Sequence, residues 1–198
     1  MQEVRHARRV FNLVAPVYGL IARVMQPEYR RVAALLQERR LLEPQTTVLD
    51  VGTGTGALAG ILAEVTPWVT GIDLSEKMLA AGRRRYGERV AFRQAAAHEL
   101  KRFGPGEFDL VTAALVLHGP AAPYRRRVLG EMRRVARKKV VIVDYVPHRS
   151  LGVAAIEALE GSHYREFLRE FAGEVTAAFP RVEVVRLTKI WGLYLCDP

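Results

Sequence analysis

Residues 48–60, VLDVGTGTGALAG, combine an acid with three closely spaced glycines after an apolar segment. Gly52, Gly54 and Ala57 match the pattern G-x-G-x-x-G/A, in which glycines let the backbone approach a bound nucleotide. Asp73 lies 21 residues after Gly52, a distance at which an acid can hydrogen-bond ribose hydroxyls. On these features alone, a dinucleotide such as NAD is a legitimate ligand.

Asp50 changes this interpretation, because it lies two residues before the first glycine. A carboxylate there would repel a pyrophosphate, whereas it would attract a ligand that carries a cationic group. S-adenosylmethionine carries an ammonium and a sulfonium next to its adenosine and has no phosphate. We therefore expect Asp50 to attract the ammonium, directly or through water, and Asp73 to accept hydrogen bonds from the ribose hydroxyls.

Methyl transfer from a sulfonium is an in-line displacement, so positioning of the two reactants dominates catalysis. A general base is needed only where the acceptor loses a proton. His118 follows the fourth expected strand and is a candidate base or orienting group, with a loop histidine bonded to backbone as the alternative. His163 and Tyr164, in EGSHYREFL, form a second catalytic candidate, with helix capping and packing as the alternative.

The elements that must position these residues alternate between strands and helices. Apolar segments predict strands at 47–51, 68–73, 90–93, 108–114 and 139–145, and helical patterns cover 27–42, 56–65, 75–86, 123–136 and 162–179. The chain closes with VEVVRL and IWGLYL, two strands separated only by Thr188 and Lys189, which can pair antiparallel. This order predicts a doubly wound, mostly parallel seven-stranded α/β sheet with a C-terminal antiparallel hairpin strand. In such sheets, ligands bind beyond the carboxyl ends of the strands, where the glycine loop falls.

The composition is that of a globular protein. Its 198 residues favour one domain, and 49% hydrophobic with 26% charged residues allows a full core. No run approaches the roughly 18 apolar residues that a membrane span needs. The N-terminus lacks a signal-peptide apolar stretch, so we expect a cytoplasmic protein. Cys196 is the only cysteine, which excludes an internal disulfide and every multi-cysteine zinc pattern, and we expect no metal.

The formal net charge of +9 comes from arginine, clustered at Arg83–Arg85, Arg125–Arg127 and Arg133–Arg134. A basic chain makes polyanions plausible partners through counterion release. The alternative is that these arginines solvate exposed helix faces and pair with Glu. We expect a small-molecule acceptor, with nucleic acid possible but not favoured.

Several segments resemble the motifs of one enzyme family. VLDVGTGTGALA resembles the first motif of class I S-adenosylmethionine-dependent methyltransferases, and GIDLSEKMLAAGRRR resembles their second-strand motif. FDLVTAALVLHG is similar to the fourth-strand motif, and EMRRVARKKVVIVDY to the helix and strand that follow. The N-terminal VFNLVAPVYGLIARVMQPEYRRVAALL is similar to the lead-in of the ubiquinone/menaquinone-biosynthesis type. The resemblance implies a single methyltransferase domain, with N-terminal lid helices in 1–42 and a Rossmann-like core in 43–198.

The resemblance also implies a set of cofactor contacts. They would come from Tyr18, Asp50, Gly52, Thr53, Gly54, Gly56, Asp73, Leu74, Met78, Ala96, Ala97, Ala113 and Ala114. The glycine loop would line the methionine portion, Leu74 and Met78 would pack on adenine, and Ala113 would lie near the sulfonium. Two positions depart from the family: Ala96 stands where an acid usually accepts from the adenine amino group, and Gly19 replaces the Asp after the lead-in Tyr.

The acceptor class follows from what the motifs lack. The segment AALVLHG lacks the Asn/Asp-Pro-Pro-aromatic signature of enzymes that methylate exocyclic amines of adenine or cytosine. Only 16 residues separate the fifth strand from the helix at Ser162, too few for a large substrate cap. We therefore expect a small or flat acceptor. The alternatives are an RNA-directed methyltransferase, a catalytically silent S-adenosylmethionine-binding protein and, more distantly, an NAD oxidoreductase.

Overall fold

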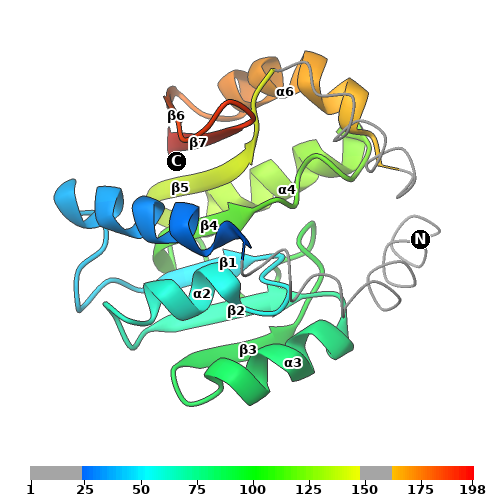
Figure 1. Cartoon of the computed structure of the whole chain (residues 1–198). Helices are drawn as coiled ribbons and strands as arrows, with labels where there is room; N and C mark the ends of the chain where they lie inside the picture. Colours follow the sequence, from blue (N-terminus) through cyan, green and yellow to red (C-terminus); the bar gives the residue numbers. More distant parts are fainter. Residues whose placement is uncertain (1–23, 148–161) are drawn as a thin grey trace.

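A central sheet organises the structure, a computed structural model that describes residues 24–147 and 162–198. Seven strands in these ranges lie in the order β3-β2-β1-β4-β5-β7-β6 (Figure 1). They are β1 Val48–Val51, β2 Val69–Asp73, β3 Val90–Gln94, β4 Phe108–Ala114, β5 Ala136–Tyr145, β6 Arg181–Arg186 and β7 Trp191–Asp197. Neighbouring strands from β3 to β5 are parallel, whereas β7 runs antiparallel to β5 and β6. The predicted doubly wound, mostly parallel α/β sheet with an antiparallel hairpin strand is therefore confirmed.

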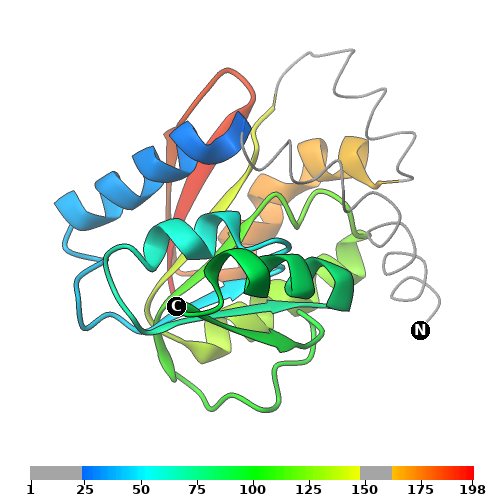
Figure 2. The same ribbon diagram turned by 60° about the horizontal axis from the view of Figure 1, so that its bottom comes forward.

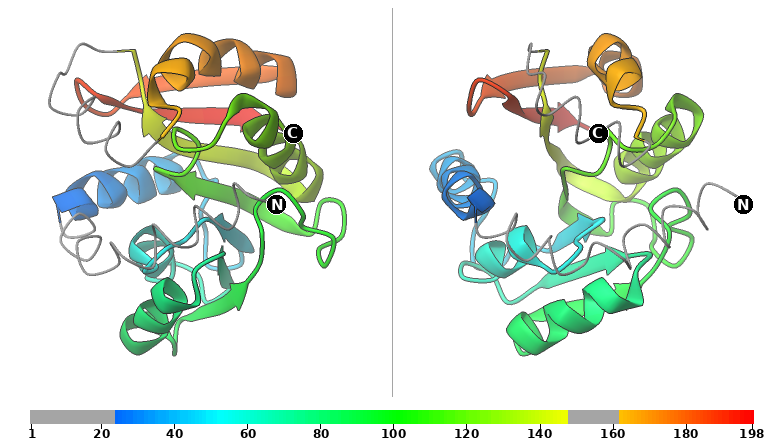
Figure 3. Two further views of the ribbon diagram at one scale, coloured as in Figure 1. Left: turned by 90° about the vertical axis from the view of Figure 1, so that its right-hand side faces the viewer. Right: turned by 45° about the vertical axis from the view of Figure 1, so that its right-hand side comes forward.

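Helices cover both faces of the sheet. They are α2 Ala57–Leu62, α3 Glu76–Tyr86, α4 Ala122–Val135, α6 Tyr164–Ala178 and a helix over residues 24–38. The right-hand view of Figure 3 shows helix 24–38 and α2 on the side of the sheet opposite α4 and α6. Two clusters of buried apolar side chains match these layers, one beneath helix 24–38, α2 and α3, and the other beneath α4 and α6.

Strand geometry decides which polar residues reach which face. Successive side chains of a strand point to opposite faces. Val48 packs beneath helix 24–38 and α2, so Asp50, two residues further along β1, points to that same face. Ile142 packs beneath α4 and α6, so Asp144 at the end of β5 points to the other face. The two acids therefore approach the carboxyl edge of the sheet from opposite sides.

Helix 24–38 lies beside the β6–β7 hairpin, as Figure 2 shows. Its buried face includes Met25, Tyr29, Val32 and Leu36. Two polar contacts tie this segment to the hairpin: Arg31 donates to the Leu187 carbonyl at 2.9 Å, and Arg39, just after the helix, forms a bidentate ion pair with Glu183 at 2.5 and 2.8 Å.

The end of this helix differs from the sequence prediction, which continued it to residue 42. The chain leaves the helix because Arg40 adopts a φ of 57°. Leu41 N donates to the Leu36 carbonyl at 2.8 Å and Arg40 N donates to the Gln37 carbonyl at 2.9 Å, which together form a Schellman motif. Glycine usually occupies the position of Arg40 in this motif, so the sequence contains no stop signal there.

The other elements agree in position with the prediction, and some of them differ from it at their ends. α3 is capped by Ser75 and ends at Tyr86, as predicted. β5 begins three residues early, directly after α4, because its first residues pair with Phe108 and Leu110 of β4 across a register shift. The final hairpin has a four-residue connection rather than two, because Leu187 and Ile190 belong to the turn and not to the strands. In this turn, Thr188 Oγ1 accepts from Ile190 N and Trp191 N.

Part of the predicted lid, residues 1–23, lies outside the described residues. Within the described ranges, the structure has no helix with the length and apolar character needed to cross a membrane. In the same part of the chain, no three His, Cys, Asp or Glu side chains gather where they could hold a metal ion.

Candidate functional site

The glycine loop follows β1 at the position where the strand order reverses, between β1 and β4. Gly52, Gly54 and Gly56 all have positive φ, at 69°, 55° and 78°. A Cβ atom on Gly52 would lie 2.6 Å from Val116 Cγ2, whereas a Cβ atom on Gly54 would meet no atom within 4 Å. The loop therefore packs tightly at its first glycine and faces open space at its second.

Asp73, the last residue of β2, supports this loop directly. Its Oδ2 accepts from Gly54 N at 2.9 Å, and its Oδ1 accepts from Ser75 N at 2.8 Å. Burial raises the pKa of this carboxyl, and the two main-chain donors oppose the rise. Each carboxylate oxygen has two lone pairs, so Asp73 retains acceptor capacity for ligand hydroxyls while it holds the loop.

Asp50 lies beneath the loop and is only 2% exposed. Its Oδ1 accepts from Thr112 Oγ1 of β4 at 2.6 Å. Burial raises the pKa of Asp50 to about 6, although the Thr112 hydrogen bond acts in the opposite direction. The Thr53 side chain packs against Gly71, and its hydroxyl, like that of Thr112, acts to lower the pKa of Asp50. The site thus holds a buried carboxylate that a cation would stabilise.

Tyr29 of helix 24–38 joins this group and was not foreseen from the sequence. Its side chain is buried on the face to which Asp50 points. Burial raises the pKa of the Tyr29 phenol, and the charges of Asp50 and Asp144 raise it further. Tyr29 therefore remains a neutral hydroxyl in the electric field of both acids. In the sequence, the indication was that Tyr29 falls on the apolar face of the helix, which places its hydroxyl among apolar side chains.

The expected adenine side is formed by the ends of β2 and β3. Met78 is buried in the first turn of α3, and Leu74 is half-buried. The Leu74 carbonyl accepts from Gln94 Nε2 at 2.9 Å, which ties the β2 end to the β3 end. Ala96 and Ala97 are half-buried in the loop after β3. Leu74, Ala96 and Ala97 follow the strand ends that a nucleotide would span, and Met78 lies in the helix that begins after β2.

The remaining expected cofactor residues are placed differently. Ala113 is buried in the core beneath α4 and α6, whereas Ala114 is half-buried at the end of β4. Tyr18 lies outside the described residues.

His118 and Asp144 form a dyad at the ends of β4 and β5. His118 Nδ1 lies 2.8 Å from Asp144 Oδ1, and the Asp144 side chain is fully buried. The same carboxylate accepts from Leu117 N and Tyr145 N, each at 2.9 Å. An acid that accepts from Nδ1–H fixes the tautomer of a neutral imidazole with its lone pair on Nε2. Asp144 was missed in the sequence, where its signal was a single acid ending the apolar run KVVIVDY.

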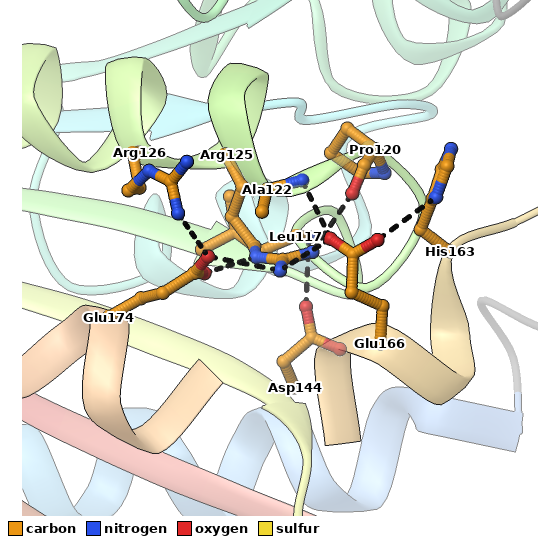
Figure 4. Close-up of polar contacts among 9 residues, drawn as sticks. All are labelled: Leu117, Pro120, Ala122, Arg125, Arg126, Asp144, His163, Glu166 and Glu174. Carbon is orange, nitrogen blue, oxygen red and sulfur yellow. Dashed lines mark hydrogen bonds and ion pairs between the residues drawn. The ribbon is translucent and has the colours of Figure 1, made fainter. Parts of the chain in front are cut away.

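His163 and Tyr164 stand at the start of α6. His163 N donates to the Gly119 carbonyl at 3.0 Å, and its half-exposed ring lies 3.4 Å from Glu166 Oε2 (Figure 4). Tyr164 is buried and packs edge-on against Tyr145, with ring centroids 5.0 Å apart. The geometry of both residues is that of helix anchoring and packing next to the His118 loop.

Comparisons with known proteins identify similar methyltransferases. A family model described as a methyltransferase domain matches residues 48–139. Demethylmenaquinone methyltransferase of Thermotoga maritima is 36% identical over 152 residues, covering 72% of this chain and 63% of that protein. The chain therefore spans less than two thirds of that relative. Phosphatidylethanolamine N-methyltransferase of Cereibacter sphaeroides is 35% identical over 176 residues, covering 84% of this chain and 82% of that protein.

The fold is also found among solved structures. Magnesium protoporphyrin IX methyltransferase from Synechocystis PCC 6803, solved with bound SAH, superposes with a TM-score of 0.61 at 19% identity, covering 87% of this chain and 83% of that one. The sheet order, the glycine loop and the relatives lead to one conclusion: this chain belongs to the class I S-adenosylmethionine-dependent methyltransferases, and it is similar to members of the ubiquinone/menaquinone-biosynthesis type.

Proposed function

We propose that the chain transfers the methyl group of S-adenosylmethionine to a small-molecule acceptor by in-line displacement. The observation that carries this proposal is the position of two features on neighbouring strands. The glycine loop with Asp73 follows β1 and β2, and the His118–Asp144 dyad follows β4 and β5. Since β1 and β4 are paired, and paired strands lie about 4.8 Å apart, a donor site and a proton acceptor come close together.

The residues present fit the methyl donor. Space opens at Gly54, and the buried Asp50 carboxylate favours a cationic ligand. We assign Asp50, Gly52, Thr53, Gly54 and Gly56 to the methionine portion. We assign Asp73 to the ribose, Leu74, Met78, Ala96 and Ala97 to the adenine, and the half-buried Ala114 to the region of the methyl group.

The bound donor supplies an electrophilic methyl on a sulfonium. The residues of this chain orient the donor, exclude water and manage the acceptor's proton. Asp144 keeps the lone pair of neutral His118 on Nε2, and His118 takes the proton of an acceptor hydroxyl or amine at that atom. His163 and Tyr164 act as support for this loop, since their contacts are to Gly119, Glu166 and Tyr145.

The names of the relatives indicate the chemical class of the acceptor. Demethylmenaquinone and phosphatidylethanolamine, the acceptors in those names, are both amphipathic small molecules. We infer an acceptor of this kind, with a nucleophilic head beside His118 and an apolar remainder. As part of the same proposal, the chain works in the cytoplasm, where a single, buried cysteine stays reduced.

The arginine pairing argues against an RNA acceptor. Arg125 is fully buried and bonded to Glu174, Arg134 is paired with Glu131, and Arg83 with Glu76. These three arginines come from the three clusters that raised the possibility of nucleic acid. Their charges are partly neutralised within the fold, so they are weaker phosphate contacts than the sequence suggested.

Two measurements test the proposal. Calorimetry with S-adenosylmethionine should give an affinity at least about tenfold weaker for Asp73→Ala than for the wild type, because charged hydrogen bonds to the ribose are lost. Equal affinities, or tight NAD binding, would overturn the cofactor assignment. Transfer of labelled methyl into a cell extract should then place the label in the lipid and quinone fraction. Label in RNA would favour the RNA-directed alternative, and binding without any transfer would favour a silent protein.

A further inference from the structure

The loop between β4 and α4, residues 115–121, is fixed on two sides. On the β5 side, Leu117 N and His118 Nδ1 bond to Asp144. On the α6 side, the Gly119 carbonyl accepts from His163 N, at the start of α6, at 3.0 Å, and the Pro120 carbonyl accepts at 2.9 Å from Nη1 of Arg125, a residue of α4 that bonds to α6. Immediately after the loop, Ala122 N donates to Glu166 Oε1 at 2.9 Å. The place of the His118 ring therefore depends on α6 as well as on Asp144.

Arg125 is at the centre of the α6 side, as Figure 4 shows. Its side chain is 0% exposed. Its Nε and Nη2 bond to the two oxygens of Glu174, and Nη2 also lies 3.4 Å from Glu166 Oε1. Its guanidinium carbon lies 5.5 Å from the centroid of the Phe167 ring. The His118 ring packs edge-on to that same ring at 6.3 Å, so only one side chain separates the ion cluster from the dyad.

Packing of α4 against α6 does not by itself explain this cluster. Apolar residues of both helices already share one buried core, among them Val128, Met132, Phe171 and Val175. Buried ion pairs often contribute no more stability than apolar residues of the same volume, because desolvation offsets the attraction. What a guanidinium adds is several donors in a fixed fork, which can orient a carbonyl and two carboxylates together.

We propose that Arg125 is a positioning residue for the His118–Asp144 dyad. By holding Pro120, Glu166 and Glu174 at once, it fixes the loop that carries His118 and the ring of Phe167 behind it. This inference rests on the proposed function, since it concerns the base of that reaction. The geometric consequence, however, can be measured without any acceptor.

The chain offers a matched control on the same helix. Arg134 of α4 also bonds to a glutamate, Glu131, at 2.8 and 2.9 Å. It also donates to two carbonyls, those of Phe103 and Leu100, at 2.9 and 3.0 Å. These contacts lie at the end of α4 away from the His118 loop. Arg134→Lys therefore removes the same kinds of bond as Arg125→Lys without touching the dyad.

The test uses the full chain labelled with ¹⁵N, including the histidine rings, with His118→Gln to assign the His118 signals. In Arg125→Lys, we expect the Nδ1–H tautomer of His118 to lose population and the Ala122 and His163 amides to exchange about tenfold faster. S-adenosylmethionine, the probe for the cofactor site, should bind within about twofold of the wild-type affinity. In Arg134→Lys, the His118 ring and both amides should behave as in the wild type.

Unchanged His118 ring signals in Arg125→Lys would overturn the proposal, as would identical changes in both lysine variants. If Arg125→Lys does not fold, Glu174→Gln replaces it, since this change weakens the ion pair that orients the Arg125 guanidinium and leaves Glu166 bonded to Ala122 N. That variant should also shift the His118 ring signals, and no shift would overturn the proposal. Because these measurements need no acceptor, they can fail or succeed independently of the methyl-transfer assay.

Discussion

His118 Nδ1 lies 2.8 Å from Oδ1 of Asp144, a carboxylate that is fully buried yet accepts from two main-chain N–H groups as well. Those main-chain donors stabilise the buried charge whether or not His118 is present. The acid is therefore set in place by β5 and the loop after β4, and it orients the imidazole rather than the reverse. Because the orientation of His118 depends on Asp144, Asp144 is the residue to change first.

Asp144→Asn should reduce turnover without weakening cofactor binding. If the amide NH₂ faces Nδ1, the neutral ring adopts the other tautomer and its lone pair leaves Nε2. We expect the single-turnover rate with the identified acceptor to fall by about 10²–10⁴-fold, the usual range for general-base catalysis. The affinity for S-adenosylmethionine in calorimetry should stay within about twofold.

Asp109→Asn is the control for this variant. Asp109 is also a buried acid of the sheet, but it bonds to Thr47 and Arg137 at the amino end of β4. Its replacement should lower the unfolding temperature and leave turnover unchanged. A wild-type rate in Asp144→Asn would remove His118 from the role of base.

The sequence was sufficient to predict the sheet, and it brings the residues proposed for the cofactor together for a local reason. Asp50, the three glycines and Asp73 lie close in sequence, and strand ends bring them together in any sheet of this order. Asp144, Tyr29 and Arg125 could not be assigned in the same way. Each acts through a partner far along the chain, such as His118 for Asp144 and Glu174 for Arg125. Arg125 was interpreted as part of an exposed basic run, because its burial depends on how α6 packs.

Gly54→Ala should weaken cofactor binding strongly while lowering the stability of the fold only slightly. The new methyl group meets no protein atom, and the strain at a φ of 55° costs about 1–2 kcal/mol. The unfolding temperature should therefore fall by only a few degrees. The affinity for S-adenosylmethionine should fall by at least about tenfold, because the methyl group occupies the space into which the loop opens.

Gly106→Ala is the matched control for the loop variant. Gly106 has a φ of 61°, and its added methyl group would come no closer than 3.9 Å to another atom, Arg137 Cβ. The two variants should therefore lose similar stability, while Gly106→Ala keeps wild-type cofactor affinity. Equal cofactor affinity in both would show that the open space at Gly54 is not part of the binding site.

Asp50→Asn should stabilise the ligand-free protein and weaken cofactor binding. Burial raises the pKa of Asp50 from 3.8 to about 6, so the folded chain binds this proton more readily than the unfolded chain between those pH values. The cost of the buried charge is absent at low pH, grows as pH rises through this window, and is fully present at pH 7. A pKa difference of this size corresponds to about 3 kcal/mol. Asn keeps the bond to Thr112 without that cost, so the variant should unfold at a higher temperature than the wild type at pH 7.5, and the difference should vanish near pH 4.

Cofactor binding, in contrast, should favour the ionised form of Asp50. A cationic ligand stabilises ionised Asp50, so the wild-type affinity for S-adenosylmethionine should rise between pH 5 and pH 7, and binding near pH 5.5 should release a proton. Calorimetry in buffers of different ionisation enthalpy measures that release. Asp50→Asn should bind more weakly at pH 7 and lose the pH dependence. If the wild-type affinity is the same at pH 5 and pH 7, Asp50 does not face the ammonium, and the acid before the glycines serves only to hold Thr112. Because a purely structural acid would give the stability effect without the binding effect, the two measurements together decide what Asp50 does.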